Sequence, residues 1–131
     1  MDGTYMMGEP AAFLGDALYV KTKDLVERWH VDRSSVQTIL GAHGVDRSSI
    51  HRSPHYRWYD VLTGVEQVPA SFLIDEKTVE AIIATPLLTT AQMADALCVT
   101  PQTIRNYVKA GRLNPIRLTE RTPRFRRLEP V

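Results

Sequence analysis

The residues best suited to chemistry lie in the last third of the chain, and their side chains suit the recognition of nucleic acid. Arg105 can donate two parallel hydrogen bonds to a guanine edge, and Asn106 or Gln102 can pair with adenine in a similar way. A cluster of guanidinium groups follows soon after, at Arg117, Arg121, Arg124, Arg126 and Arg127. Such groups suit phosphates or a narrow minor groove, and their contribution falls with salt.

Three histidines raise the alternative of a metal site. His51 and His55 have the i, i+4 spacing that can bind zinc on a helix. Ser53-Pro54 lies between them, however, and disfavours a continuous helix there. His43 is the third histidine, and the only cysteine, Cys98, is distant in sequence. We therefore expect a solvated or phosphate-facing loop, with no metal and no cofactor.

No catalytic arrangement stands out in the sequence. Ser34-Ser35 and Ser48-Ser49 have no histidine and aspartate partners placed by a known motif. A glycine-rich loop that could cradle a phosphate is also missing from the sequence. We therefore expect a binding protein and not an enzyme.

Charge is distributed unevenly along the 131 residues. The formal net charge is only +1, but residues 1–86 hold 8 Lys/Arg against 12 Asp/Glu, whereas residues 87–131 hold 8 against 3. A basic last third suggests contact with nucleic acid, although two solvated faces of opposite sign would give the same counts. Neither a basic segment ahead of an apolar run nor an apolar run of about 20 residues is present, which favours a cytoplasmic protein with no membrane contact.

An internal repeat organises the chain. When the sequence is shifted by 68 positions, apolar and polar residues match without a gap for over twenty residues. The matches include Thr22 with Thr90, Leu25 with Met93, Val31 with Val99, and Val36 with Ile104. After one extra residue in the first copy, Gly44 matches Gly111 and Arg57-Trp58 matches Arg124-Phe125. Two copies of one unit are the simplest explanation, with coincidence between two amphipathic helix pairs as the alternative.

The second copy predicts two helices joined by a short turn. Thr89 and Gln92 form a capping box for the first helix, while Thr100 and Pro101 begin the second and Gly111 ends it. The inward face of the second helix would hold Ile104, Tyr107 and Val108. The residues left to point outward are Gln102, Thr103, Arg105, Asn106 and Lys109.

A β-hairpin is expected after the second helix. Residues 115–118 alternate, with Ile116 and Leu118 on one side, and residues 119–123 are turn-like. The chain would return with Phe125 inward and with Arg124 and Arg126 outward. We expect the large aromatic residues to be part of the core rather than base-stacking platforms, namely Trp29, Trp58, Tyr107 and Phe125.

The first copy is a variant of the same pattern. Thr22 or Asp24 would begin its first helix and Asp32 would cap its second, with an inward face of Val36, Ile39 and Leu40. A possible second set of DNA contacts consists of Arg33, Ser34, Gln37 and Thr38 on this helix and Arg47, Arg52 and Arg57 in a longer wing from His43 to Trp58. Asp32 and the acidic surroundings oppose phosphates, so this copy could instead contact protein.

A linker with one short helix separates the copies. Asp75 would cap a helix that runs to Ala84, with Val79, Ile82 and Ile83 on one side. A helix this short is unstable alone, so it must pack on one copy, between the copies, or on a second chain.

The stretch from Leu88 to Leu113 reads LTTAQMADALCVTPQTIRNYVKAGRL and resembles the MerR-like winged helix-turn-helix superfamily, nearest to small phage excisionases. Arg124–Arg127 resembles that group's returning wing strand, and residues 18–61 resemble the unit loosely. The resemblance implies that the second helix enters the major groove with Gln102, Thr103, Arg105, Asn106 and Lys109. It implies that the wing contacts DNA with Arg117, Arg121, Arg124 and Arg126. A turn position that the family usually fills with glycine holds Cys98 here and His30 in the first copy.

The sequence as a whole predicts an α+β, mainly α fold of tandem winged helix-turn-helix units with small β-hairpin wings. We expect an N-terminal tail at 1–17, a first unit at 18–62, a linker at 63–86 and a second unit at 87–131. The expected function is sequence-specific binding of double-stranded DNA, as a phage or mobile-element excisionase-type architectural factor or a compact transcription regulator. The partners would be DNA, a homodimer or cooperative assembly on it, and a recombinase or other protein. No coiled coil or effector domain is recognisable, so no small-molecule effector is expected. The alternative is a protein-interaction adaptor or a packaging protein like a terminase small subunit.

Overall fold

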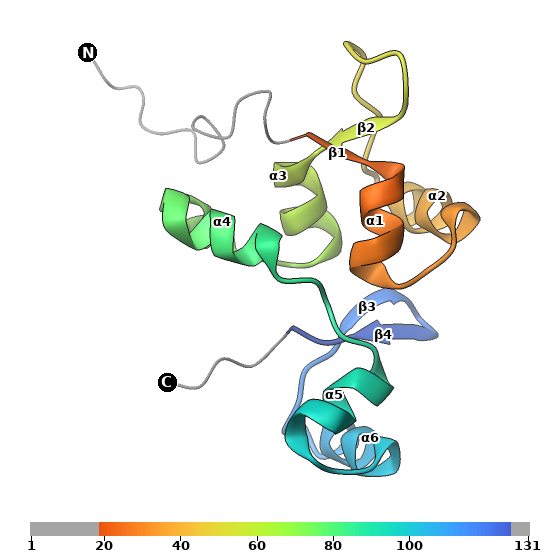
Figure 1. Ribbon diagram of the computed structural model, residues 1–131, viewed down its shortest axis with the longest axis vertical. Coiled ribbons are helices and arrows are strands. Elements are labelled where there is room, and N and C mark those ends of the chain that lie inside the picture. Colours follow the sequence, from red (N-terminus) through yellow and green to blue (C-terminus); the bar gives the residue numbers. More distant parts are fainter. Residues whose placement is uncertain (1–18, 127–131) are drawn as a thin grey trace.

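A computed structural model describes residues 19–126 of the chain, and Figure 1 shows that part as helices with two small strand pairs. Within this range the elements follow in the order β1 (Tyr19–Lys21), α1 (Thr22–Trp29), α2 (Arg33–Ala42), β2 (His55–Arg57), α3 (Trp58–Asp60), the π-helical turn η2 (Val61–Val65), the 3₁₀ turn η3 (Ala70–Leu73), α4 (Glu76–Ala84), α5 (Thr90–Leu97), α6 (Pro101–Lys109), β3 (Ile116–Thr119) and β4 (Thr122–Arg124). Two antiparallel sheets form, β1 with β2 and β3 with β4. The expected mixed and mainly helical class is therefore confirmed.

The first helix pair forms nearly as its sequence predicts. The Asp32 side chain accepts a hydrogen bond from the Ser35 amide at 2.7 Å and so caps α2. Val36, Ile39 and Leu40 are buried on its inner face. Helix α1 begins at Thr22 instead of Asp24, and no side chain caps it.

The second helix pair begins and ends at the capping residues that its sequence predicts. Thr89 and Gln92 complete a capping box on α5, and Thr100 caps α6 with Pro101 at its first position. Gly111 has a positive φ of +76°, and its amide donates to the Val108 carbonyl at 3.1 Å. Helix α6 therefore ends at a glycine of the expected kind.

The two helix pairs repeat in their backbone geometry. Helices α1 and α5 have eight residues each and begin 68 positions apart, as do α2 and α6 at their first residues. His30 (φ 56°) and Cys98 (φ 59°) both adopt the left-handed conformation that turns the chain from one helix to the next. The amides that follow donate to equivalent carbonyls, Val31 to Val26 and Val99 to Ala94.

The strand register corrects one match of the internal repeat. Val20 lies opposite Tyr56 in the β1–β2 pair, and its equivalent Leu88 lies opposite Phe125 in an isolated bridge. Tyr56 therefore takes the place of Phe125, and the expected equivalence of Trp58 with Phe125 is wrong by two residues. Between the paired positions, the first copy (Val20 to Tyr56) is one residue shorter than the second (Leu88 to Phe125), and not one residue longer as the sequence comparison assumed. Trp58 instead begins α3.

The expected wing of the first copy is not a hairpin. Between residues 43 and 58 the structure has one strand, β2, which pairs with β1 rather than with a neighbour in its own loop. The loop before it folds back through a hydrogen bond from the Ser48 amide to the His55 carbonyl at 2.7 Å. In the second copy the hairpin does form, and its turn is only Glu120-Arg121. That turn is shorter than the expected one at 119–123.

The C-terminal hairpin packs against the first helix pair. Ile116 and Leu118 of β3 belong to the larger hydrophobic core, together with Leu87 and residues of α1, α2 and η2. Figure 1 shows β3 and β4 between α1 above and the α5–α6 pair below. A separate small core contains Met93, Ala94, Ile104 and Phe125. The larger core therefore extends across the expected boundary at residues 86 and 87.

The linker joins the same larger core. Asp75 caps α4 as expected, and Val79 of α4 and Leu73 of η3 are buried in the larger core. Arg28 of α1 donates to the Ile82 and Ile83 carbonyls and so joins α4 to the first helix pair. Of the three packing possibilities for this helix, the structure shows the first, packing on one copy. In the range that the structure describes, no helix is long and apolar enough to cross a membrane.

Candidate nucleic-acid interface

The outer face of α6 carries a row of exposed polar side chains. Gln102, Arg105, Asn106 and Lys109 are all exposed. Arg105 donates from Nε to Gln102 Oε1 at 3.2 Å, and Gln102 Nε2 donates to Asn106 Oδ1 at 3.1 Å. Gln102, Arg105 and Asn106 each offer more than one hydrogen-bonding group, and all three lie on the same exposed face of α6.

Thr103 has a different position from the rest of that set. Its side chain is half-buried, and its amide donates to Thr100 Oγ1 at 3.2 Å. The two hydroxyl groups lie 2.9 Å apart. Thr103 is therefore engaged in the start of α6.

The hairpin adds two exposed arginines beside the helix. Arg117 lies on β3 and donates to the Glu120 carbonyl at 3.4 Å, while Arg121 lies in the turn. A hollow of about 260 Å³ separates α6 from the hairpin, and the side chains of Arg105, Lys109 and Arg117 all line it. The fold thus gathers cations from a helix and a strand around one surface depression.

Arg124 and Arg126 do not point outward, which corrects their expected orientation. Arg124 donates from Nε to the Trp29 carbonyl at 2.7 Å and from Nη2 to the His30 carbonyl at 3.1 Å. Burial lowers the pKa of Arg124, but a guanidinium stays protonated in proteins. Arg126 lies 3.4 Å from a carboxylate oxygen of Glu66. Arg124 therefore ties the hairpin to the first helix pair, and Arg126 ties the chain after β4 to Glu66 at the end of η2. Arg127 lies outside the described residues.

Glu66 and Arg28 form a buried ion pair that sequence reasoning missed. The Glu66 side chain is fully buried, and Arg28 bonds it at 2.7 Å and 2.9 Å. Trp29 Nε1 donates to the same carboxylate at 2.8 Å. Arg28 also donates to the Ile83 carbonyl at 2.9 Å, near the end of α4. A glutamate inside the apolar stretch from Val61 to Val68 was the available signal.

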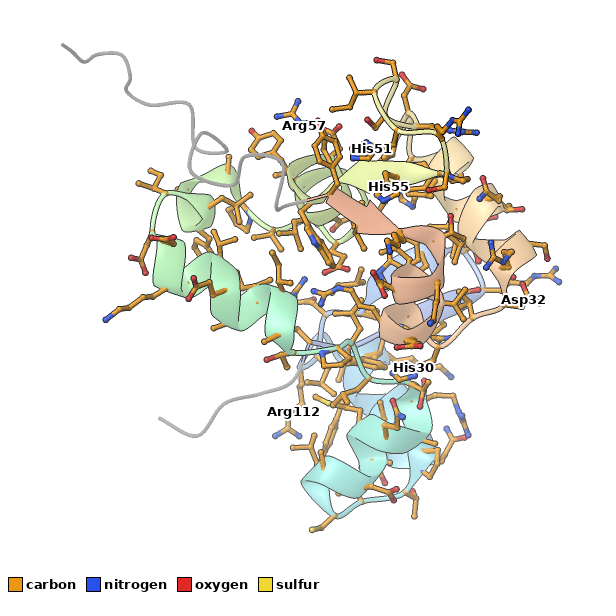
Figure 2. The ribbon with its side chains drawn as sticks, turned by 45° about the horizontal axis from the view of Figure 1, so that its top comes forward. His30, Asp32, His51, His55, Arg57 and Arg112 are labelled. Carbon is orange, nitrogen blue, oxygen red and sulfur yellow. The ribbon has the colours of Figure 1, made fainter. Side chains whose placement is uncertain are left out.

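On α2, the side chains of the expected second set of DNA contacts are exposed, but several of them already make hydrogen bonds within the protein. Arg33, Ser34, Gln37 and Thr38 all face solvent. Ser34 donates to Asp32, Thr38 donates to the Ser34 carbonyl, and Tyr56 donates to Gln37 Oε1. Hydrogen bonds from Ser35 and then Ser34 hold the pKa of Asp32 below its ordinary value, so its carboxylate stays charged at the start of α2. Figure 2 shows Asp32 at the edge of the molecule, where it would repel a phosphate.

The loop before β2 and β2 itself carry the other expected arginines and two stacked histidines. Arg47, Arg52 and Arg57 are exposed, and Arg47 donates to the Arg52 carbonyl. The rings of His51 and His55 stack with centroids 4.1 Å apart, close to Arg57 in Figure 2. His43 lies elsewhere and bonds the Leu118 carbonyl at 3.0 Å. Among the residues that the structure describes, no three metal-ligating side chains come together.

Comparison with known proteins gives no further evidence about this interface. No known family model matches the chain, and no curated protein or solved structure matches it either.

Proposed function

We propose that the chain binds double-stranded DNA through α6 and the β3–β4 hairpin, with its two helix pairs as tandem helix-turn-helix units. One observation carries the proposal. Arg105 and Lys109 of α6 and Arg117 of β3 surround a single hollow, directly beside the exposed amides of Gln102 and Asn106. Cations that gather next to paired hydrogen-bond groups on one helix are what a major-groove contact requires.

The exposed groups divide into two roles. Gln102, Arg105 and Asn106 would read base edges in the major groove, each good pair contributing about 1–3 kcal/mol of discrimination. Lys109, Arg117 and Arg121 would contact phosphates and set the register of the helix on the duplex. Arg124 and Arg126 support the interface indirectly, since their hydrogen bonds hold the hairpin in place.

A compact, sequence-specific DNA-binding protein of this kind fits the role of an excisionase-type architectural factor or a small transcription regulator. The shared core and the Arg124 hydrogen bonds join the two helix pairs, so the first pair would be held at a fixed position beside a duplex bound by α6. The partners in such a complex would be a second copy of the chain, as a homodimer or bound cooperatively on DNA, and a recombinase or other protein. The resemblance of the sequence to small phage excisionases supports a phage or mobile-element context.

The test is fluorescence anisotropy with duplex DNA at several salt concentrations. Arg117→Ala should weaken binding to a random duplex and reduce the slope of log affinity against log salt by about 1, because one phosphate contact is lost. Arg105→Ala should cost about 1–3 kcal/mol on the preferred site and relax specificity there. Arg33→Ala is the matched control, since it removes an exposed arginine from the first turn of α2.

Either of two results would contradict the proposal. The wild-type chain could fail to bind a duplex even at low salt, which would leave the hairpin arginines without a nucleic-acid role. Alternatively, Arg33→Ala could reduce the salt slope as much as Arg117→Ala, which would place the phosphate contacts on another surface.

A further inference from the structure

Two large apolar side chains are exposed at the start of α4. Phe72 is 54% exposed and Ile74 is 65% exposed, on either side of the buried Leu73. Acidic residues follow at once, with Asp75 at the N-cap and Glu76 in the first turn of α4. Figure 1 shows that this end of α4 projects away from α5 and α6. We call Phe72, Ile74 and Glu76 the apolar knob.

The hollow beside α6 has the opposite character. Its floor is apolar, with Ile104, Val108 and Phe125, and its rim carries Arg105, Lys109 and Arg117. No acidic side chain is among the residues that line it. An apolar cavity of about 150 Å³ can bind benzene, so a hollow of about 260 Å³ has room for the ring of a phenylalanine.

We propose that the apolar knob of one copy of this chain docks into the hollow between α6 and the hairpin of a second copy. Phe72 and Ile74 would cover the apolar floor, and the acidic start of α4 would face the cationic rim. Burial of exposed apolar surface drives such a contact, and opposite charges set its orientation. No other part of the described chain combines exposed large apolar groups with adjacent acids in this way.

The contact is heterologous, because it joins two different surfaces of the same chain. Each copy keeps a free knob or a free hollow, so copies can add one after another. The contact is also small, and we expect weak association that depends on concentration. If α6 binds DNA as proposed above, DNA and the second copy would compete, since both require Arg105 and Lys109.

The experiment is sedimentation velocity of the full chain over a range of concentrations, without DNA. Wild type should show a mass that rises with concentration above the 14.8 kDa of one chain. Phe72→Ser/Ile74→Ser removes the knob and should stay monomeric. Ile50→Ser is the matched control, because Ile50 is 69% exposed on a different loop, and it should associate like wild type.

A second variant closes the hollow without touching the proposed DNA contacts. Thr90 lines the hollow at the first position of α5, where an added carboxylate is favourable for the helix. Thr90→Glu should therefore fold but repel Glu76 of the apolar knob, while Thr90→Gln should still associate.

Mixing the two variants gives the decisive result. The knob variant keeps its hollow and Thr90→Glu keeps its knob, so an equimolar mixture should form dimers of twice the chain mass and no larger species. The proposal is overturned if wild type stays monomeric at high micromolar concentration, if the knob variant associates like wild type, or if the mixture stays monomeric. None of these outcomes depends on whether the chain binds DNA.

Discussion

At the scale of single residues, the charged side chains divide into those that face solvent and those that hold the fold. Arg105, Arg117 and Arg121 are exposed on α6 and the β3–β4 hairpin. Arg28 and Glu66 are buried together, and Glu66 also accepts a hydrogen bond from Trp29. A buried carboxylate with several donors is stable only while each partner is present, because an unpaired buried charge is strongly disfavoured.

Glu66→Gln should therefore destabilise the fold severely. It removes the negative charge that compensates Arg28, and the free energy of unfolding should fall by about 3–5 kcal/mol. Urea denaturation followed by circular dichroism measures this change. Glu80→Gln, on the exposed side of α4, is the control and should have little effect. Equal stability of Glu66→Gln and Glu80→Gln would show that the ion pair does not hold the linker to α1.

At the scale of elements, the turn between the helices of each pair depends on a single left-handed residue. His30 and Cys98 hold these two positions, with φ of 56° and 59°. Residues with a Cβ atom are strained in this conformation, and glycine is not. The positions match in both copies, so the strain is built into the same point of the repeat.

Cys98→Gly should accordingly stabilise the protein. Relief of the left-handed strain should raise the free energy of unfolding by about 1 kcal/mol, partly offset by the greater freedom of glycine in the unfolded chain. Cys98→Ala is the matched control, because it removes the thiol but keeps the Cβ atom, and it should give no such gain. A rise in the urea midpoint for both variants alike would attribute the effect to the thiol instead.

At the scale of the whole molecule, one core contains parts of both sequence repeats. Ile116 and Leu118 follow α6 in sequence but pack with α1, α2 and η2. Arg124 adds hydrogen bonds from β4 to the end of α1. The α5–α6 pair has only a small core of its own around Met93 and Ile104.

A fragment of residues 87–131 should therefore not fold like the same segment in the full chain. Without the first helix pair, Leu87, Ile116 and Leu118 would lose their packing partners and be exposed to water. Hydrogen exchange of the α5 and α6 amides measures the effect, and the full chain is the reference. Equal protection of these amides in the fragment and in the full chain would show that the second helix pair is an independent domain.

The features that could be predicted from the sequence are those that depend on residues close together along the chain. The caps at Asp32, Asp75, Thr89 and Thr100 were predictable, because each hydrogen bond joins residues three positions apart. The outward face of α6 was predictable for a similar reason, since the helical period decides which side chains share a face. The 68-residue repeat predicted the paired helices and their turns, but it placed an extra residue in the first copy before β2, where the strand pairing shows one residue fewer.

What the tertiary structure alone decided are the contacts between distant residues. Arg124 and Trp29 are 95 positions apart, His43 and Leu118 are 75 apart, and Arg28 and Glu66 are 38 apart. Local sequence sets the direction of a side chain along its own element, but not which other element lies against it. Arg117 and Arg124 stand on the two strands of one hairpin and look alike in sequence, yet one faces solvent and the other caps α1. The hairpin packs on the first helix pair because Ile116 and Leu118 bury their apolar surface there, and that packing settles which arginines of the hairpin stay exposed.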